Sequence, residues 1–194
     1  ENLKNLTNSS RPHIICVSKT FPLSKLEPLI NFGHCHFGEN KVQEAEIKWS
    51  QIVKTNKNLK IHMVGKLQSN KAKKAINIFN FIHSLDNLKL ADVCKKSEDE
   101  LNKKISYFIQ VNIGNESQKS GILMKDVKSF FKYCSVENKL NIIGLMVLPP
   151  NDNNTEKYFE EISKLNSELG LKDLSMGMST DYKIATKHKS TYLR

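Results

Sequence analysis

Residues 14–40 read IICVSKTFPLSKLEPLINFGHCHFGEN and show the pattern that repeats along the whole chain. The run 14–19 is short and rich in isoleucine and valine, which is typical of a strand buried on both faces. Ser24 and Glu27 then form a capping box ahead of an apolar helical stripe. Residues 35–38 predict a second strand, so the segment forms a β-α-β unit with two parallel strands.

Six more strand candidates follow, and helical patterns separate them. They are residues 61–65, 81–85, 107–113, 142–148, 174–178 and 191–194. Eight strands that alternate with seven helices predict α/β architecture and a parallel sheet closed into a single (β/α)8 TIM barrel. An open doubly wound sheet is the alternative, and the lack of a glycine-rich dinucleotide turn after any strand disfavours it.

Local signals mark several helix ends. Asn40 with Gln43 is a second capping pattern, and residues 127–134 carry apolar side chains at the spacing of one helix face. Gly170 follows an apolar helical stripe and predicts its C-terminal end. We expect one domain over residues 1–194, shortened at both ends. The first residue is Glu1, and the chain stops inside strand eight, so the last helix of the barrel is absent from this chain.

The composition indicates a soluble globular protein. Hydrophobic residues make up 39% of the 194 residues and charged residues 26%. No apolar run approaches the roughly 20 residues that cross a bilayer, and the polar start is unlike a signal peptide. The four cysteines have no metal-ligand spacing, so we expect no metal site and a cytoplasmic location.

The net charge of +10 raises the question of nucleic-acid binding. Only Arg11 and Arg194 among the 30 basic residues are arginine, and the lysines are spread along the chain. A surface that reads bases usually favours the forked guanidinium of arginine. The best cluster, at residues 71–74, is explained by a solvated helix face, so we expect no nucleic-acid partner.

Four polar residues lie at the end of a predicted strand or just after it, where barrels of this class place their sites. Lys19 ends the first strand, and partial burial there would favour the neutral amine that attacks an aldehyde. Asn40 follows the second strand and can bind a ligand as well as cap a helix. Ser179 follows strand seven and Arg194 lies on strand eight, where phosphate often binds in such barrels.

Each of these residues also has an ordinary structural explanation. Lys19 is one of 28 lysines and could simply end a strand, and Arg194 could be a surface charge. His62 and His83 lie inside predicted strands and are best explained as interior histidines. Only the combination of several such residues at one end of a barrel indicates a site.

Taken in order, the segments resemble the pyridoxal phosphate (PLP) homeostasis protein family, also called the proline synthetase co-transcribed family. The matching blocks are VSKT (17–20), FGENKVQE (37–44), HMVGKLQSNK (62–71), HSLD (83–86), QVN (110–112), GLM (144–146), LSMGMS (174–179) and STYLR (190–194). Each block is modest alone, but eight in this order are specific. The sequence departs from the family pattern at Lys189, where the family usually has glycine, and in lacking the family's continuation after Arg194.

The resemblance implies a barrel of the alanine racemase N-terminal type with PLP bound as a Schiff base on Lys19. It places Asn40 near the cofactor ring and assigns Ser179 and Arg194 to the phosphate cup. It also implies a carrier or buffer of PLP that has no established catalytic turnover and delivers PLP to apo-enzymes.

The alternative is a PLP-dependent racemase or decarboxylase. Such enzymes need positioned acids and bases besides the cofactor, and racemases of this barrel type take a second base from a further β-domain. A chain of 194 residues has no room for that domain. We therefore expect a monomeric carrier and not an enzyme.

Overall fold

The computed structural model describes residues 12–194, and Arg11 lies outside this range. Its main strands are β1 (His13–Ile14), β2 (Cys16–Val17), β3 (His36–Glu39), β4 (Lys60–Met63), β5 (Phe81–Leu85), β6 (Ser106–Asn112), β8 (Asn141–Val147), β9 (Asp173–Ser175) and β10 (Tyr192–Leu193). All of them pair in parallel, in the order β1-β10-β9-β8-β6-β5-β4-β3-β2. The α/β barrel predicted from the alternation is therefore confirmed.

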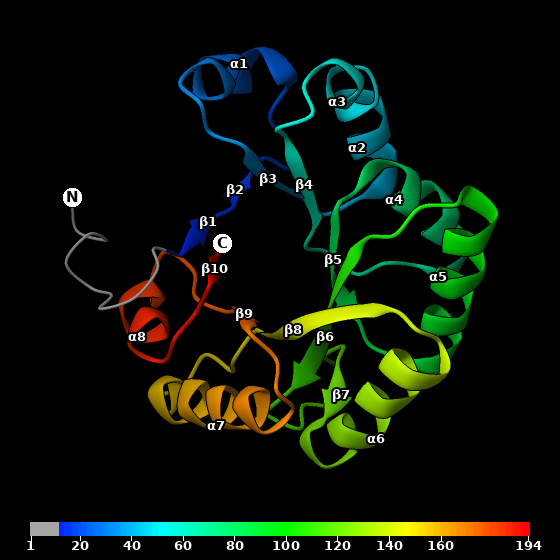
Figure 1. Ribbon diagram of the computed structural model, residues 1–194. Coiled ribbons are helices and arrows are strands. Elements are labelled where there is room, and N and C mark those ends of the chain that lie inside the picture. Colours follow the sequence, from blue (N-terminus) through cyan, green and yellow to red (C-terminus); the bar gives the residue numbers. More distant parts are fainter. Residues whose placement is uncertain (1–11) are drawn as a thin grey trace.

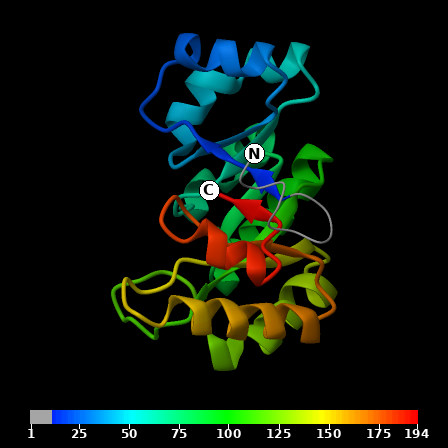
Figure 2. The same cartoon turned by 90° about the vertical axis from the view of Figure 1, so that its left-hand side faces the viewer.

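The sheet closes on itself through its first strand. β1 and β2 are two parts of one extended segment interrupted at Ile15, and they bond to different neighbours. β1 pairs with β10, with His13 opposite Tyr192, whereas β2 pairs with β3, with Val17 opposite Gly38. Figure 2 shows β1 and β10 lying side by side. The first and last strands of the chain thus meet, and eight strand positions surround the barrel.

Helices surround the strands, as Figure 1 shows. They are α1 (Leu23–Asn31), α2 (Val42–Trp49), α3 (Ile52–Thr55), α4 (Ala72–Ile78), α5 (Leu88–Leu101), α6 (Val127–Lys132), α7 (Thr155–Glu168) and α8 (Tyr182–Lys187). A π-helical turn, Tyr133–Glu137, extends α6 and buries Cys134. When β1 and β2 are counted as one strand, each of the first seven strand positions around the barrel is followed by a helix, with the short β7 between β6 and α6, which confirms the predicted alternation.

The core has two parts. The larger cluster includes side chains from the strands and the helices around them, among them Trp49 and Phe159, which are both fully buried. The smaller cluster comprises Ile15, Phe108, Met146 and Tyr192. The Tyr192 ring contacts aromatic rings from β3, β4, β5 and β6, so this cluster fills the inside of the barrel.

Two predicted helix caps are wrong. α1 begins at Leu23 after Pro22, whose ring fixes a φ of −69° that suits helix entry, and no side chain caps it, so Ser24 lies inside the helix. α2 begins at Val42 with Lys41 at the cap position, one residue beyond Asn40. The prediction for Gly170 is confirmed, because it follows α7 with a φ of +69°, which glycine adopts without strain.

One strand has no counterpart in the sequence prediction. β7 (Ile122–Leu123) pairs with β6 beside the barrel path, and two residues are too few to give a periodic signal. No helix within residues 12–194 is long and apolar enough to span a membrane.

Candidate functional site at the carboxyl end of the barrel

The four predicted site residues gather on one arc of the barrel rim. Ser179 follows β9, Arg194 follows β10, Lys19 follows β2 and Asn40 follows β3. These strands are consecutive around the barrel, and all run in the same direction. Their carboxyl ends therefore bring a lysine amine, an arginine guanidinium, a hydroxyl and an amide to neighbouring positions on one rim.

Lys19 lies in a tight turn and not in the strand itself. The backbone N–H of Phe21 donates to the carbonyl of Ser18 at 3.2 Å, and Thr20 has a φ of +70°, a left-handed conformation that costs energy for a non-glycine residue. The Lys19 side chain is exposed. The expected partial burial of this lysine is therefore wrong, and its amine is open to a ligand from solvent.

A buried carboxylate holds this turn against the next strand. One oxygen of Glu39, Oε1, accepts hydrogen bonds from Ser18 Oγ at 2.8 Å, Lys48 Nζ at 2.7 Å and Trp49 Nε1 at 2.9 Å. Lys48 also donates to the carbonyl of Ser18 at 2.7 Å. Glu39 is fully buried. The residue directly before Lys19 is thus fixed by β3 and α2, a network that the sequence analysis missed because its members are far apart in the chain.

Asn40 is half-buried and lines a cavity of about 350 Å³ together with Gly65, Gln110 and Asn112. A Cβ atom at Gly65 would collide with the backbone of Asn40. Glycine is thus needed for the close approach of the loops after β3 and β4. The structure places Asn40 beside a cavity at the barrel mouth, where its amide can reach a ligand.

Ser179 and Arg194 line a second cavity, of about 260 Å³, at the same end of the barrel. The Arg194 guanidinium donates from Nη1 to Ser175 O at 3.0 Å and Ser175 Oγ at 2.7 Å, and from Nη2 to Val147 O at 2.9 Å. Burial lowers the pKa of Arg194 to about 10. The explanation of Arg194 as a surface charge is therefore wrong, because its side chain reaches across the ends of β8 and β9.

Three interior histidines connect to Arg194 through Ser175. His83 Nδ1 lies 2.8 Å from Ser175 Oγ, His62 Nδ1 lies 2.9 Å from His83 Nε2, and His36 Nδ1 lies 3.0 Å from His62 Nε2. We call these four residues with Arg194 the histidine ladder. His62 and His83 are fully buried, which confirms them as interior histidines. His36 and Ser175 were missed, although each lies in or directly before a block that matches the family.

Arginine sets the direction of the first bond in the ladder. Since Arg194 can only donate, Ser175 Oγ accepts from it, and the same oxygen lies within hydrogen-bond distance of His83 Nδ1. In each of the two histidine–histidine contacts, one ring nitrogen donates and the other accepts. Each ring has one donor and one acceptor, as neutral imidazole requires. Burial lowers the pKa of His36 to about 4, and those of His62 and His83 well below the usual value.

No group of three or more His, Cys, Asp or Glu residues within residues 12–194 is arranged to hold a metal ion. The rim presents an exposed amine, that of Lys19, and an arginine on consecutive strands, which suits a ligand with an electrophilic carbonyl and an anionic group.

The sequence of this chain is similar to those of known proteins. A family model described as the N-terminal domain of alanine racemase matches residues 1–194. The pyridoxal phosphate homeostasis protein of Aquifex aeolicus is 33% identical over 190 residues, which cover 93% of this chain and 82% of that protein. The protein of the same name from Escherichia coli is 30% identical over 190 residues, covering 93% and 81%.

Solved structures also show similarity to this family and to alanine racemase. PipY of Synechococcus elongatus is 33% identical, and its structure without PLP superposes with a TM-score of 0.88, covering 94% of this chain and 89% of that one. The PipY structure with PLP bound gives 0.86. Alanine racemase of Bartonella henselae shares the fold, with a TM-score of 0.77 at 14% identity over 54% of its length. This chain therefore belongs to the pyridoxal phosphate homeostasis protein family, whose barrel is that of the alanine racemase N-terminal domain.

Proposed function

We propose that the chain binds PLP through a Schiff base on Lys19 and acts in PLP homeostasis as a carrier or buffer of the cofactor. The observation that carries the proposal is the arc on which Lys19, Asn40, Ser179 and Arg194 follow consecutive strands. The PipY structure with PLP bound supports it through a relative of the same fold.

The residues present fit this cofactor. PLP, when bound, supplies an aldehyde and a phosphate on an aromatic ring. Lys19 offers an exposed amine that forms no ion pair among residues 12–194. Arg194 and Ser179 line one cavity that can accept the phosphate, and Asn40 lines another cavity on the same rim. The amine forms the covalent bond, and the other three residues orient the cofactor.

The burial of the candidate bases near this rim favours a carrier over an enzyme. Proton removal from an amino acid needs a base held on a defined face in a site that excludes water. Glu39 is buried and engaged by three donors, and His62 and His83 are engaged in the histidine ladder. All three side chains are fully buried, so none of them is exposed at the rim to act as that base. The names of the relatives, which describe homeostasis, favour the same conclusion.

Borohydride reduction tests the covalent bond. The purified protein with PLP is expected to be yellow, and reduction should fix the cofactor on a single peptide that contains Lys19. Lys19→Arg should lose the adduct, whereas Lys25→Arg, at an exposed neighbouring lysine of α1, should keep it. An adduct found only on other lysines would refute the assignment.

Hydrogen exchange at Cα separates the carrier from a racemase or decarboxylase. The protein with PLP is incubated with L- or D-alanine in deuterated water and compared with free PLP. We expect exchange no faster than the free cofactor gives, and no loss of carbon dioxide. Stereospecific exchange well above that rate, abolished in Lys19→Ala, would restore the enzyme alternative. Delivery of PLP to apo-enzymes, a monomeric state and a cytoplasmic location are further parts of the proposal.

A further inference from the structure

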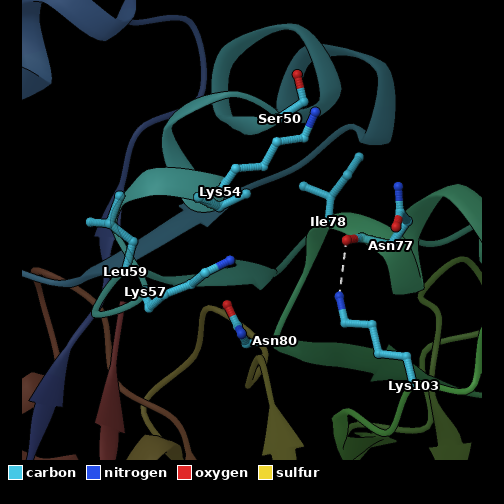
Figure 3. Close-up of a pocket in the computed structure, with 9 residues that line it drawn as sticks. Ser50, Lys54, Lys57, Leu59, Asn77, Ile78, Asn80 and Lys103 are labelled. Atoms are coloured by element: carbon cyan, nitrogen blue, oxygen red, sulfur yellow. Dashed lines mark hydrogen bonds between the residues drawn. The ribbon is translucent and has the colours of Figure 1, made fainter.

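A separate cavity of about 350 Å³ lies at the opposite end of the barrel from Lys19. Its walls come from α3, from the end of α4, and from the segments that lead into β4, β5 and β6. Because these segments precede their strands, the cavity opens at the amino ends of the strands. Figure 3 shows the residues that line it. It shares no lining residue with the two cavities at the carboxyl rim.

Three lysines and no carboxylate line this cavity. Figure 3 shows Lys57 and Lys103 reaching into it from opposite sides, and Lys54 extends along its rim. None of the three forms an ion pair within the part of the chain that the structure describes. By contrast, the neighbouring Lys104 is paired with Glu98 at 2.7 Å. Three like charges around one cavity repel each other, and a bound anion would relieve that repulsion.

Hydrogen bonds to the backbone hold two polar side chains of the cavity, Lys103 and Asn80. Lys103 Nζ donates to the carbonyl of Asn77 at 2.9 Å, which leaves two of its N–H groups for a ligand. Asn80 Oδ1 accepts from the backbone of Ile61 at 2.9 Å, and its own backbone N–H donates to the Ile61 carbonyl at 2.9 Å. The Asn80 side chain is thus held rigidly, and its NH2 group has no partner within residues 12–194.

The remaining wall is apolar. Leu59 and Ile78 are buried and line the cavity, and the half-buried Val53 also lines it. The volume falls at the lower end of the range for small-molecule sites, which is roughly 300–1,000 Å³. A cavity of this size takes a small molecule with an anionic head and a short apolar part.

We propose that this cavity binds a small phosphomonoester, with its phosphate among Lys54, Lys57 and Lys103 and its organic part against Leu59 and Ile78. A phosphomonoester carries close to two negative charges at neutral pH and three acceptor oxygens, which match three ammonium groups and the Asn80 amide. The site is distinct from the one proposed for PLP, since the two lie at opposite ends of the barrel.

NMR titration of the full chain tests the site, with and without added PLP. The ligands are inorganic phosphate, phenyl phosphate and succinate. We expect saturable shifts in the amides of Lys57, Asn80 and Lys103 with both phosphates, tighter binding of phenyl phosphate because of the apolar wall, and weaker binding of succinate. One equivalent of PLP should react first at Lys19 and leave these shifts unchanged, whereas excess PLP, which is itself a phosphomonoester, should compete with phenyl phosphate.

Paired variants separate the cavity from the general positive charge. Lys57→Gln with Lys103→Gln should weaken phenyl phosphate binding at least about fivefold. The control, Lys132→Gln with Lys172→Gln, removes two exposed lysines elsewhere and should change it less than about twofold. Equal losses in both pairs, shifts that map only to the carboxyl rim, or succinate binding as tightly as phenyl phosphate would each overturn the proposal.

Discussion

At the scale of single residues, Arg194 has both a structural and a proposed binding role. Its guanidinium joins the ends of β8 and β9 through Val147 and Ser175, and it also lines the cavity that contains Ser179. Lysine would offer one point charge in place of a planar fork and could not make the same set of bonds. The sequence indicated this importance only through rarity, because Arg194 is one of two arginines among 30 basic residues.

Arg194→Ala should therefore weaken PLP binding more than pyridoxal binding, because only PLP carries the phosphate. A sheltered charge-assisted contact accounts for roughly 1.5–3 kcal/mol. The measurement is the dissociation constant of each ligand, with the free energy of unfolding recorded in parallel. Equal weakening for both ligands would mean that Arg194 acts only through its bonds to the strand ends.

Lys189 stands where the family usually has glycine, and the structure explains that preference. Its φ is +65°, a left-handed conformation that costs a non-glycine residue about 1–2 kcal/mol. Lys189→Gly should raise the free energy of unfolding by about 1 kcal/mol. Lys187→Gly, two residues earlier at the last residue of α8, should lower it by up to about 1 kcal/mol. Urea denaturation measures both, and a loss in Lys189→Gly would contradict the strain argument.

At the scale of elements, strands were predicted well and helix caps poorly. Residues 81–85 form β5 with the predicted bounds, because a short apolar run between polar segments has few other interpretations. The strand predicted at 174–178 ends earlier, at Ser175, since Gly177 turns the chain with a φ of +97°. Caps depend on the path of the preceding residues, which composition does not reveal. The contacts of Glu39 and Ser175 join distant elements, so no local pattern could predict them.

The ion pair that joins β3 to α2 should contribute strongly to stability. Lys48 and Glu39 are 2.7 Å apart with side chains only 10% and 0% exposed, so Lys48→Met leaves a buried carboxylate without its cation. We expect a loss of about 3 kcal/mol in the free energy of unfolding. Lys73→Met breaks an equally short pair with Glu100, but there the side chains are 61% and 40% exposed. It should cost less than about 1 kcal/mol, and similar losses in the two variants would contradict this distinction.

At the scale of the whole molecule, the barrel encloses polar side chains as well as apolar ones. The histidine ladder crosses the interior from His36 to Arg194, and the Tyr192 ring packs against all three imidazoles. The alternation of strands and helices predicted the barrel, but not the contents of its interior. Those depend on which side of each strand faces inward, and a shift of one residue in register would reverse it.

This interior should make the fold sensitive to acid. The folded-state pKa of His36 is about 4, below the ordinary 6.5, so the unfolded chain binds more protons between these values. The free energy of unfolding should therefore be highest above pH 6.5 and fall as the pH is lowered toward 4. His62 and His83 are shifted in the same direction and extend the loss further.

Urea denaturation across this pH range measures the effect. His36→Gln should give a shallower dependence on pH. A wild-type stability that is flat between pH 4 and 6.5 would refute the linkage.

The chain contains a single tryptophan, Trp49, and this residue belongs to the hydrogen-bond network around Glu39. The indole of Trp49 is fully buried, and its N–H bonds to the same carboxylate oxygen that holds Ser18, the residue next to Lys19. Its fluorescence is therefore a built-in reporter at the base of the lysine turn. Emission from one indole can follow cofactor loading and release in real time, with no dye attached to the protein.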